Sequence, residues 1–333
     1  MILAGDIGGT NTRLALCESP ADLKDLREFK SADHPSLGSI VRQYLDQSSF
    51  DSAIQCACFG VAGPVHGEPG LRYSPITNLK WTVQQQNLAE VLNLDPERVR
   101  VINDLAANAA GIDVLAKDKL YTLQEGKSQP GGRGIVSAGT GLGVGGAIWD
   151  AGQHIPCPSE GGHYSFGPRN ELECHLLQFL AAREQETFAG YVSWERVLSG
   201  PGLYNLFLFH AARDIGRQSV QIPAGTSAGA AAMLVSKAAM ASQCERSSMA
   251  LDLFVSLYGA AAGNVAIQYT AIDGLYVGGG IAPKILDRLK SPAFLHAFLD
   301  KGPMRERLLK DVPVKVILDE HCALRGAAVE ATR

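Results

Sequence analysis

Short apolar runs separated by turn signals divide the first half of the chain. Apolar residues follow one another in Ile2–Ala4, Ala53–Phe59 and Val99–Ile102, runs that are too short for helices and suit buried strands. In Ser36–Gln47 they recur at helical spacing, which predicts an amphipathic helix that begins at a serine cap. The same reasoning predicts further strands over 13–17, 134–138, 144–149, 275–277 and 314–318, and further helices over 82–92, 193–202, 222–243, 248–269 and 323–331. Strands with helices inserted between them indicate an α/β fold.

The strand over Val99–Ile102 delivers Asn103 and Asp104 to its carboxyl end, where an Ala-rich helix begins. In open α/β sheets, ligands bind outside the carboxyl ends of strands. Asn and Asp are also ordinary helix N-caps, and on these residues alone capping is favoured over catalysis. The rest of the chain reverses that preference.

Two glycine-rich turns each join a pair of predicted strands. The first turn is Gly5-Asp6-Ile7-Gly8-Gly9-Thr10-Asn11-Thr12 and the second is Gly139-Thr140-Gly141-Leu142-Gly143. Glycines let a backbone approach a ligand closely, and clustered amides with a threonine hydroxyl form an anion cradle. The alternative is an ordinary hairpin turn, which usually needs only two to five residues. Asp6, placed inside the first turn, suits a magnesium ion beside bound phosphates, held through water. The turns lie about one domain's length apart, which predicts a duplicated architecture with a cleft between its halves.

Two phosphate-binding patterns are excluded by their context. G-x-G-x-x-G occurs over Gly141–Gly146, but that fingerprint needs a helix to follow at once, whereas Ala147–Gly152 predicts a strand and a turn. Gly126-Lys127-Ser128 lacks the glycine of a P-loop five residues before the Gly-Lys pair, because position 121 is Tyr.

Three polar side chains in the second half suit the recognition of adjacent sugar hydroxyls. Glu160 and His163 lie in the glycine-rich loop Pro158–His163, and Glu195 lies in the predicted helix over 193–202, which stops at Gly-Pro-Gly. Singly, such residues are more often structural or solvated. Together, two carboxylates and an imidazole offer charge-assisted hydrogen bonds.

The triple glycine Gly278–Gly280 is either a tight strand-to-helix joint or a surface for a flat adenine base.

Composition narrows the class of protein. The chain has 333 residues, 46% hydrophobic and 19% charged, which fits two globular domains. With 30 Lys and Arg against 34 Asp and Glu, the net charge is -4, so no electrostatic footprint for nucleic acid or for an anionic membrane is present. We expect no signal peptide and no apolar run of membrane-span length. The seven cysteines predict reduced, mostly buried thiols in a cytoplasmic protein, and Cys56 and Cys58 have no second pair at zinc-ligand spacing.

Taken in order, these motifs resemble one family closely, the bacterial glucokinases of the sugar kinase, heat-shock protein and actin superfamily. The matches span nearly the whole chain: Gly5-Asp-Ile-Gly-Gly-Thr-Asn11, Ile102-Asn-Asp104, Gly139-Thr-Gly-Leu-Gly143, Glu160-Gly-Gly-His163, Glu195-Arg-Val-Leu-Ser-Gly-Pro-Gly202 and Gly278-Gly-Gly-Ile281. Any one of them is weak, whereas six in register are specific.

The resemblance implies a duplicated actin-like (ribonuclease H-like) α/β sugar kinase fold in two domains with a central cleft: a small domain of 1–107 plus 316–333 and a large domain of 108–315. It implies ATP-dependent phosphorylation of D-glucose on the 6-hydroxyl, with Asp104 as general base; the need to exclude water from that reaction predicts that glucose closes the two domains. It assigns glucose contacts to Asn103, Asp104, Glu160, His163 and Glu195. It assigns the ATP phosphates to Gly5, Asp6, Ile7, Gly8, Gly9, Thr10, Gly139, Thr140 and Gly141, and the adenosine to Gly278, Gly279 and Gly280.

The resemblance also limits the remaining expectations. Related repressor-type members follow their Gly-His with a cysteine-rich zinc motif, but here Tyr164–Arg169 follows, so no structural zinc is expected. ATP with Mg²⁺ near Asp6 is expected, as is a homodimer. Two alternatives stay open: a kinase for another hexose or amino sugar, and an actin-like nucleotide-binding protein without sugar chemistry. The five predicted sugar-binding side chains favour the sugar kinase.

Overall fold

The computed structural model describes residues 1–48, 53–76, 79–185 and 189–333, and the chain forms two compact units. Unit 1 comprises Met1–Lys119, Gly146–Pro158 and Asp319–Arg333, and unit 2 comprises Leu120–Gly145 and Ser159–Leu318. The division expected from the sequence, at 107 and 316, differs from these bounds. Helix α3 (Asp104–Gly111), which that division cut, lies whole in unit 1.

A five-stranded sheet forms the centre of unit 1, in the order β3-β2-β1-β4-β7. Its strands are β1 (Ile2–Ile7), β2 (Asn11–Ser19), β3 (Asp22–Lys30), β4 (Cys56–Val61) and β7 (Val99–Asn103). β1 pairs with β4, and β4 with β7, in parallel, whereas β1, β2 and β3 form an antiparallel meander. The carboxyl ends of the three parallel strands therefore lie at one edge of the sheet.

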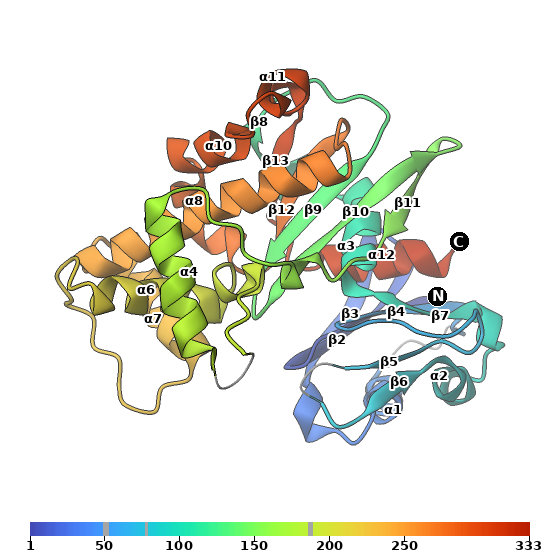
Figure 1. Ribbon diagram of the computed structural model, residues 1–333. Helices are drawn as coiled ribbons and strands as arrows, with labels where there is room; N and C mark the ends of the chain where they lie inside the picture. Colours follow the sequence, from blue (N-terminus) through green and yellow to red (C-terminus); the bar gives the residue numbers. More distant parts are fainter. Residues whose placement is uncertain (49–52, 77–78, 186–188) are drawn as a thin grey trace. The chain divides into compact units, whose positions relative to one another are not determined.

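Helices cover both faces of this sheet, because successive side chains of a strand point to opposite faces. Leu3 belongs to a core cluster with α1 (Leu37–Gln47) and α2 (Gln85–Leu92), whereas its neighbour Ala4 belongs to a cluster with α3 and α12 (Cys322–Ala331). Figure 1 shows α12, the C-terminal helix, alongside α3. The predicted helix over 323–331 therefore packs on the first unit, as expected.

Glycines let the backbones of α3 and α12 come into direct contact. A Cβ at Gly326 would lie 1.7 Å from the Ala107 carbonyl oxygen, and one at Gly111 would lie 2.1 Å from the Cys322 carbonyl oxygen. No side chain fits in either place, so the helix that begins at Asp104 is held firmly against its neighbour.

A second sheet repeats the strand order of the first, with one strand added: β11-β10-β9-β12-β13-β8. Its strands are β8 (Leu120–Gln124), β9 (Arg133–Ala138), β10 (Leu142–Asp150), β11 (Gln153–Cys157), β12 (Gly274–Gly278) and β13 (Val314–Ile317). β9, β12 and β13 are parallel neighbours, as β1, β4 and β7 are in the first sheet. The repeated order confirms the duplicated α/β architecture.

Helix α8 (Glu245–Gln268) is the central helix of unit 2 and runs across β9 and β12 (Figure 1). The other α-helices of the described part of this unit are α4 (Glu171–Arg183), α6 (Gly200–Ala212), α7 (Ala228–Met240), α9 (Leu286–Leu289), α10 (Pro292–Leu299) and α11 (Met304–Arg307). By length and composition α8 is apolar enough to span a membrane, contrary to the expectation that no such run exists. Because 72% of its most apolar window is buried, α8 serves as a core helix.

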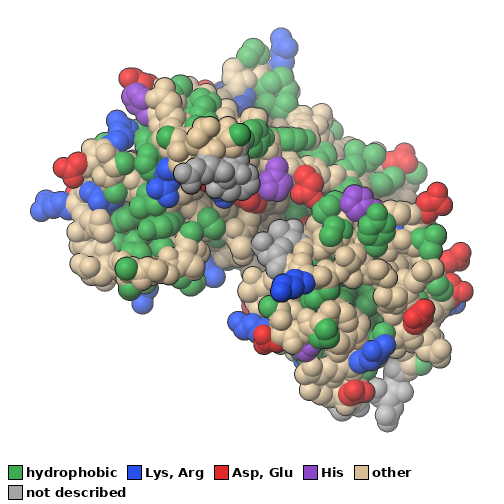
Figure 2. All heavy atoms as spheres, turned by 60° about the horizontal axis from the view of Figure 1, so that its bottom comes forward, with side chains coloured by type: hydrophobic (Ala, Val, Ile, Leu, Met, Phe, Trp, Pro, Cys, Tyr) green, Lys and Arg blue, Asp and Glu red, His purple; other side chains and the backbone are tan. Residues whose placement is uncertain are grey.

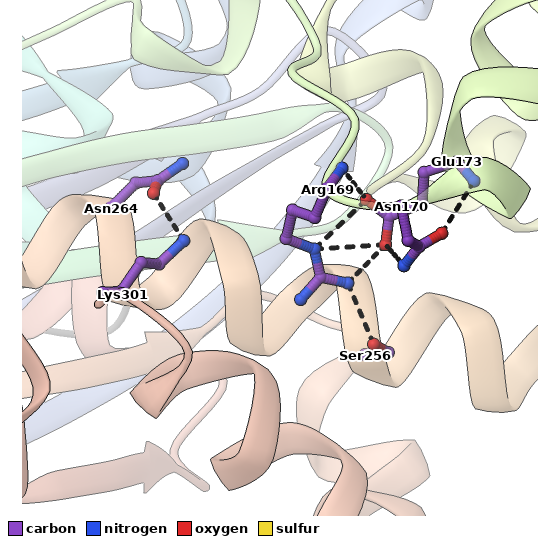
Figure 3. A network of polar contacts seen from close by, with 6 residues as sticks. All are labelled: Arg169, Asn170, Glu173, Ser256, Asn264 and Lys301. Carbon is purple, nitrogen blue, oxygen red and sulfur yellow. Dashed lines mark hydrogen bonds and ion pairs between the residues drawn. The ribbon is translucent and has the colours of Figure 1, made fainter.

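Polar groups that meet α8 are paired rather than left alone (Figure 3). The Glu173 carboxylate, 1% exposed, accepts hydrogen bonds from the Arg169 guanidinium and from the Arg169 amide at 2.8 Å. Arg169 also donates to Ser256 Oγ on α8 at 3.1 Å, and Lys301 Nζ donates to Asn264 Oδ1 at 2.7 Å. Such pairing makes the burial of these charges tolerable.

One expected helix begins later than its sequence pattern predicts. Thr82–Gln84 forms strand β6, paired with β5 (Tyr73–Pro75), and α2 starts only at Gln85. The β-branched Thr82 and Val83 favour the extended pairing.

On the face drawn in Figure 2, Lys and Arg side chains are interspersed with Asp and Glu and do not gather into one basic area.

Candidate functional site

The junction between β7 and α3 presents Asn103 and Asp104 as predicted. Asn103 is the N-cap of α3: its Oδ1 accepts the Leu105 amide at 2.9 Å, and its Nδ2 donates to the Gly63 carbonyl at 3.3 Å. Asp104 Oδ1 also accepts the Leu105 amide at 2.9 Å. Asn103 is buried and Asp104 is partly exposed. Both side chains therefore accept the Leu105 amide at the start of the helix, and Asp104 is the more exposed of the two.

Close packing brings Asp104 next to the ends of β4 and β1. A Cβ at Gly60 in β4 would lie 2.9 Å from Ala107 Cβ, and 3.7 Å from both Asp104 Cα and the Gly5 carbonyl oxygen. The absence of a side chain at Gly60 thus lets the first turn of α3 approach β1. Within unit 1, the candidate base and the first glycine turn belong to one neighbourhood.

The first glycine turn is shorter than the sequence predicts. Gly5, Asp6 and Ile7 belong to β1, where Asp6 pairs with Arg13 on one side and Gly60 on the other. Only Gly8–Thr10 form the turn, so the placement of Asp6 inside it is wrong. Pairing on both sides explains the difference, because a strand with two neighbours extends as far as its partners do.

Side chains from β2 and the segment after β3 fasten this turn. Ser31 Oγ donates to the Gly8 carbonyl at 2.8 Å and lies 3.0 Å from Thr12 Oγ1, and both side chains are fully buried. The Ser31 amide donates to the Thr10 carbonyl at 3.0 Å. In the part of the chain that the structure describes, the Gly9 amide donates to no backbone carbonyl. The Gly9 amide is one donor of the kind that an anion cradle uses.

Asp6 stands beside that turn with its charge only partly compensated. Its side chain is 24% exposed, and its carboxylate lies 3.9 Å from the Arg13 guanidinium. Burial raises the pKa of Asp6 above its ordinary value, and the positive charges of Arg13 and His321 offset part of that rise. A cation that binds at this carboxylate would relieve the cost of keeping it ionised.

The second glycine turn joins β9 to β10, as predicted, and Glu195 fastens it. The Gly139 amide donates to the Gly141 carbonyl at 2.9 Å, and the Gly139 carbonyl accepts the Gly200 amide at 2.8 Å. Glu195 Oε2 accepts the Leu142 amide at 3.0 Å, and a Cβ at Gly141 would lie 2.5 Å from that oxygen. One carboxylate oxygen therefore holds the start of β10.

The segment that carries Glu195 has a different structure from the predicted helix over 193–202. Trp194–Arg196 forms the 3-10 helix η6, and Gly200 begins α6 instead of ending a helix. Ser199 is the N-cap of α6 and accepts the Gly202 amide at 3.0 Å. Proline in the first turn favours a helix start, so Ser-Gly-Pro-Gly is an initiation signal and the predicted stop is wrong.

Glu160 and His163 are brought to the same edge of unit 2 as Glu195. Glu160 is the N-cap residue of the 3-10 helix η5 (Gly161–His163), and its carbonyl accepts the His163 amide at 2.9 Å. A Cβ at Gly162 would lie 1.9 Å from the Leu142 carbonyl oxygen. Because Leu142 also donates its amide to Glu195, η5 and η6 meet at one residue of β10.

A short ladder holds the two 3-10 helices together. The Trp194 amide donates to the Tyr164 carbonyl and the Phe166 amide to the Val192 carbonyl, each at 2.9 Å. Tyr191 donates its hydroxyl to the His163 carbonyl at 2.6 Å. Glu160, His163 and Glu195 therefore stand on a fixed platform, with Glu160 and His163 exposed. Tyr191 carried no sequence signal for this role.

The triple glycine ends β12 and wraps around Ala138, the last residue of β9. Gly279 has φ +81°, and its Cβ would lie 2.3 Å from the Ala138 carbonyl oxygen. That oxygen accepts the Ile281 amide at 3.2 Å. Pro283 lies in the 3-10 helix η7 (Ala282–Ile285), so the predicted helical start after the glycines is a 3-10 turn. The second and third glycine-rich segments are thus direct neighbours.

Metal and redox chemistry depend on clustered ligating side chains and on reactive thiols. Across residues 1–48, 53–76, 79–185 and 189–333, no group of three His, Cys, Asp or Glu side chains is placed to hold a metal. Burial raises the pKa of Cys17 and of Cys322 to about 12, so these thiols are poor nucleophiles at neutral pH.

The repeated sheets and their two glycine turns define a sugar kinase of the actin-like fold. The crystal structure of a glucokinase from an Antarctic psychrotroph matches with a TM-score of 0.80 and 30% identity, over 99% of this chain and 98% of that one. A ROK family glucokinase from Streptomyces griseus, solved with glucose and AMPPNP, shares the fold at a TM-score of 0.68 and 18% identity, over 99% of both chains.

The family follows from the sequence comparisons. The glucokinase family model matches residues 3–333. A glucokinase of Nostoc sp. is 40% identical over 349 aligned positions, which cover 100% of this chain and 99% of that protein. The chain belongs to the glucokinase family, whose activity is the ATP-dependent phosphorylation of glucose.

Proposed function

We propose that the chain transfers the γ-phosphoryl group of ATP to the 6-hydroxyl of D-glucose, with Asp104 as general base. The observation that carries this proposal is the position of Asp104 at the start of α3. Asn103 caps the helix, and Asp104 lies beside it, oriented by the Leu105 amide and partly exposed. A carboxylate in this position accepts the hydroxyl proton as the sugar oxygen attacks phosphorus.

The remaining polar residues orient the sugar. Asn103, Glu160, His163 and Glu195 bind the other hydroxyls, so that only the 6-hydroxyl is presented for transfer. The platform formed by η5 and η6 supports this role, because it fixes the Glu195 carboxylate and the backbone at Glu160 and His163 relative to β10. An epimer that leaves one buried polar group unpaired loses about 1–3 kcal/mol of binding.

The glycine turns bind the nucleotide in this proposal. Residues 5–10 and 139–141 hold the phosphates, and residues 278–280 hold the adenosine. Their close backbone approaches and the Gly9 amide support this assignment. Asp6 would hold magnesium through water, and the ion would supply positive charge against the phosphates. The raised pKa of Asp6 supports a cation there, because an ionised carboxylate with little compensation favours a positive partner.

Two broader expectations belong to the same proposal. We place the enzyme in the cytoplasm, which is supported by the free, mostly buried cysteines. We also expect a homodimer, on the family resemblance, and light scattering of the purified protein measures that mass. A kinase for another hexose or for an amino sugar is the alternative that the experiment below separates.

The test measures ADP release with glucose, mannose, fructose, galactose and N-acetylglucosamine, for the wild-type protein and for Asp104→Asn. We expect turnover with glucose and a loss of about 10³-fold in kcat for the variant, with ADP affinity unchanged. Asparagine keeps an oxygen that can accept the Leu105 amide, so the fold is preserved.

Asp95→Asn is the matched control. Asp95 also caps a short helix in unit 1, through Oδ1 and the Glu97 amide at 2.9 Å, and its substitution should leave kcat unchanged. An unimpaired Asp104→Asn enzyme would show that Asp104 only supports the helix start. Turnover with another sugar in place of glucose would reassign the substrate.

A further inference from the structure

The tyrosine at position 258 occupies an unusual place in unit 2. It lies in α8, is fully buried, and has no counterpart among the motifs of the sequence. Its ring packs edge-on against Phe254 at 5.8 Å and Phe294 at 6.1 Å between centroids. The next residue, Gly259, lets α10 approach closely, since its Cβ would lie 2.0 Å from the Phe294 carbonyl oxygen. The ring is therefore held on several sides and its hydroxyl has a fixed position.

That hydroxyl joins two strand ends. Tyr258 Oη accepts the Ala138 amide at 3.0 Å and donates to the Gly278 carbonyl at 2.9 Å. The parallel register of β9 and β12 ends at the pair Ser137 and Gly278. Beyond that pair the two strands diverge: β9 continues into the 139–141 turn, and β12 continues into the 278–280 turn. The tyrosine supplies the hydrogen bonds at the point where the ladder stops, and a phenol group has one donor and two acceptor sites with which to do so.

The 139–141 turn and the 278–280 turn meet at Ala138, whose amide Tyr258 binds. The Ala138 amide is bound by the tyrosine, its carbonyl accepts the Ile281 amide, and Gly139 follows directly. Gly279 wraps around the same residue, with a Cβ position only 2.3 Å from the Ala138 carbonyl oxygen. The spacing between the 139–141 turn and the 278–280 turn is thus fixed through one buried peptide unit and one hydroxyl.

We infer that Tyr258 is a positioning residue for the nucleotide: it fixes the distance between the turn that holds the phosphates and the turn that holds the adenosine. This inference rests on the proposed roles of the two turns. A ligand that must satisfy both turns at once binds well only when their spacing is preset, because the cost of ordering them is then already met in the free enzyme. Glucose touches neither turn in this scheme, so its binding should not depend on the hydroxyl.

The test is Tyr258→Phe, which removes the hydroxyl and keeps the ring. We expect the KM for ATP to rise about tenfold, with the KM for glucose within twofold of wild type. Hydrogen exchange should accelerate in peptides that cover 134–142 and 274–282. Tyr44→Phe is the matched control: Tyr44 is also fully buried, and its hydroxyl donates to the Asp25 carbonyl at 2.9 Å in unit 1. Its loss should leave the KM for ATP unchanged.

Calorimetric titration with ADP in the absence of sugar separates this inference from the proposed function. If the wild-type protein binds ADP but does not phosphorylate glucose, the proposed function fails and the tenfold loss of ADP affinity in Tyr258→Phe still decides the role of the tyrosine. An equal rise in KM for both substrates, the same change in Tyr44→Phe, or wild-type ADP affinity in Tyr258→Phe would each overturn the inference.

Discussion

The two glycine turns begin sheets of the same strand order, yet they are held in different ways. The Gly8–Thr10 turn in unit 1 is fastened by Ser31, which bonds to the Gly8 and Thr10 carbonyls and whose hydroxyl contacts that of Thr12. The Gly139–Gly141 turn in unit 2 is fastened by Glu195 and Tyr258, from η6 and α8. Duplication has preserved the topology and the glycines, while the groups that fix each turn differ.

The conformation of each turn therefore depends on a different part of the molecule. The first turn depends on two small buried hydroxyls and is adjacent to a partly exposed carboxylate, Asp6. The second depends on the packing of η5, η6 and α8 around Leu142 and Ala138. Substitutions far along the chain should therefore disturb the second turn, whereas the first should respond to its immediate neighbours.

The largest effect is expected from Gly162→Ala, which pushes η5 away from β10. Its Cβ would lie 1.9 Å from the Leu142 carbonyl oxygen, a backbone atom that cannot move aside cheaply. We expect a rise of at least tenfold in the KM for glucose and a loss of about 1–3 kcal/mol in the free energy of unfolding. Steady-state kinetics and urea denaturation measure the two quantities.

Gly167→Ala is the control for that substitution, because no atom lies within 4 Å of the Cβ it would introduce. It should leave both quantities near wild type. Equal behaviour of the two variants would show that the close approach of η5 to Leu142 does not set the sugar-binding side chains.

A smaller effect is expected from Ser31→Ala in the first turn. The change removes the donor to the Gly8 carbonyl and leaves the buried Thr12 hydroxyl without that partner, which costs about 1–2 kcal/mol of stability. We expect the KM for ATP to rise about threefold with the KM for glucose unchanged. Ser39→Ala is the control, since Ser39 Oγ donates to the carbonyl of Ser36, the N-cap of α1, at 2.7 Å. A glucose-specific effect of Ser31→Ala would contradict the assignment of this turn to the nucleotide.

Local signals predicted the parts of the site that depend on neighbouring residues. The strand-to-helix junction at Asn103 and Asp104 was predictable because a cap residue and its helix are adjacent in sequence. The glycine turns were recognisable for the same reason. The extent of β1 was not predictable in this way. It is set by pairing with β2 and β4, and the residues of β4 lie about fifty positions away in the chain.

Features determined by distant contacts left no local signal. Strand β3 (Asp22–Lys30) is rich in charged residues and lies at the sheet edge, where alternation is weak. Tyr258 looks like any apolar residue of a core helix, because its function depends on two strand ends that are 120 and 20 residues away in the chain. The predicted helix stop at Gly-Pro-Gly, residues 200–202, is wrong because proline and glycine also occur at helix starts.

The smallest expected effect compares how the two units respond to acid. In unit 2, His210 is 4% exposed, and neither ring nitrogen has a hydrogen-bond partner among the residues that the structure describes. Burial, with the nearby charges of Arg213 and Arg246, lowers the pKa of His210 below its ordinary 6.5. The unfolded chain therefore binds the extra proton first, so the stabilising contribution is complete above about pH 6.5 and is lost as the pH falls toward the lowered folded value.

Asp6 in unit 1 has the opposite sign. Its pKa is raised above 3.8 in the folded chain, so its contribution is complete below that value and is lost as the pH rises through the folded pKa. Mild acid should thus weaken unit 2 while it relieves the cost of the Asp6 charge in unit 1. We expect the Tm of wild type to drop between pH 7.5 and pH 5 by about 2–4 °C more than the Tm of His210→Gln does. A difference of this size corresponds to about 1 kcal/mol in the free energy of unfolding. Asp6→Asn, measured by the same calorimetric scans, should be more stable than wild type at pH 7.5 and lose that advantage in acid. Parallel Tm curves for all three proteins would mean that neither group distinguishes the two units.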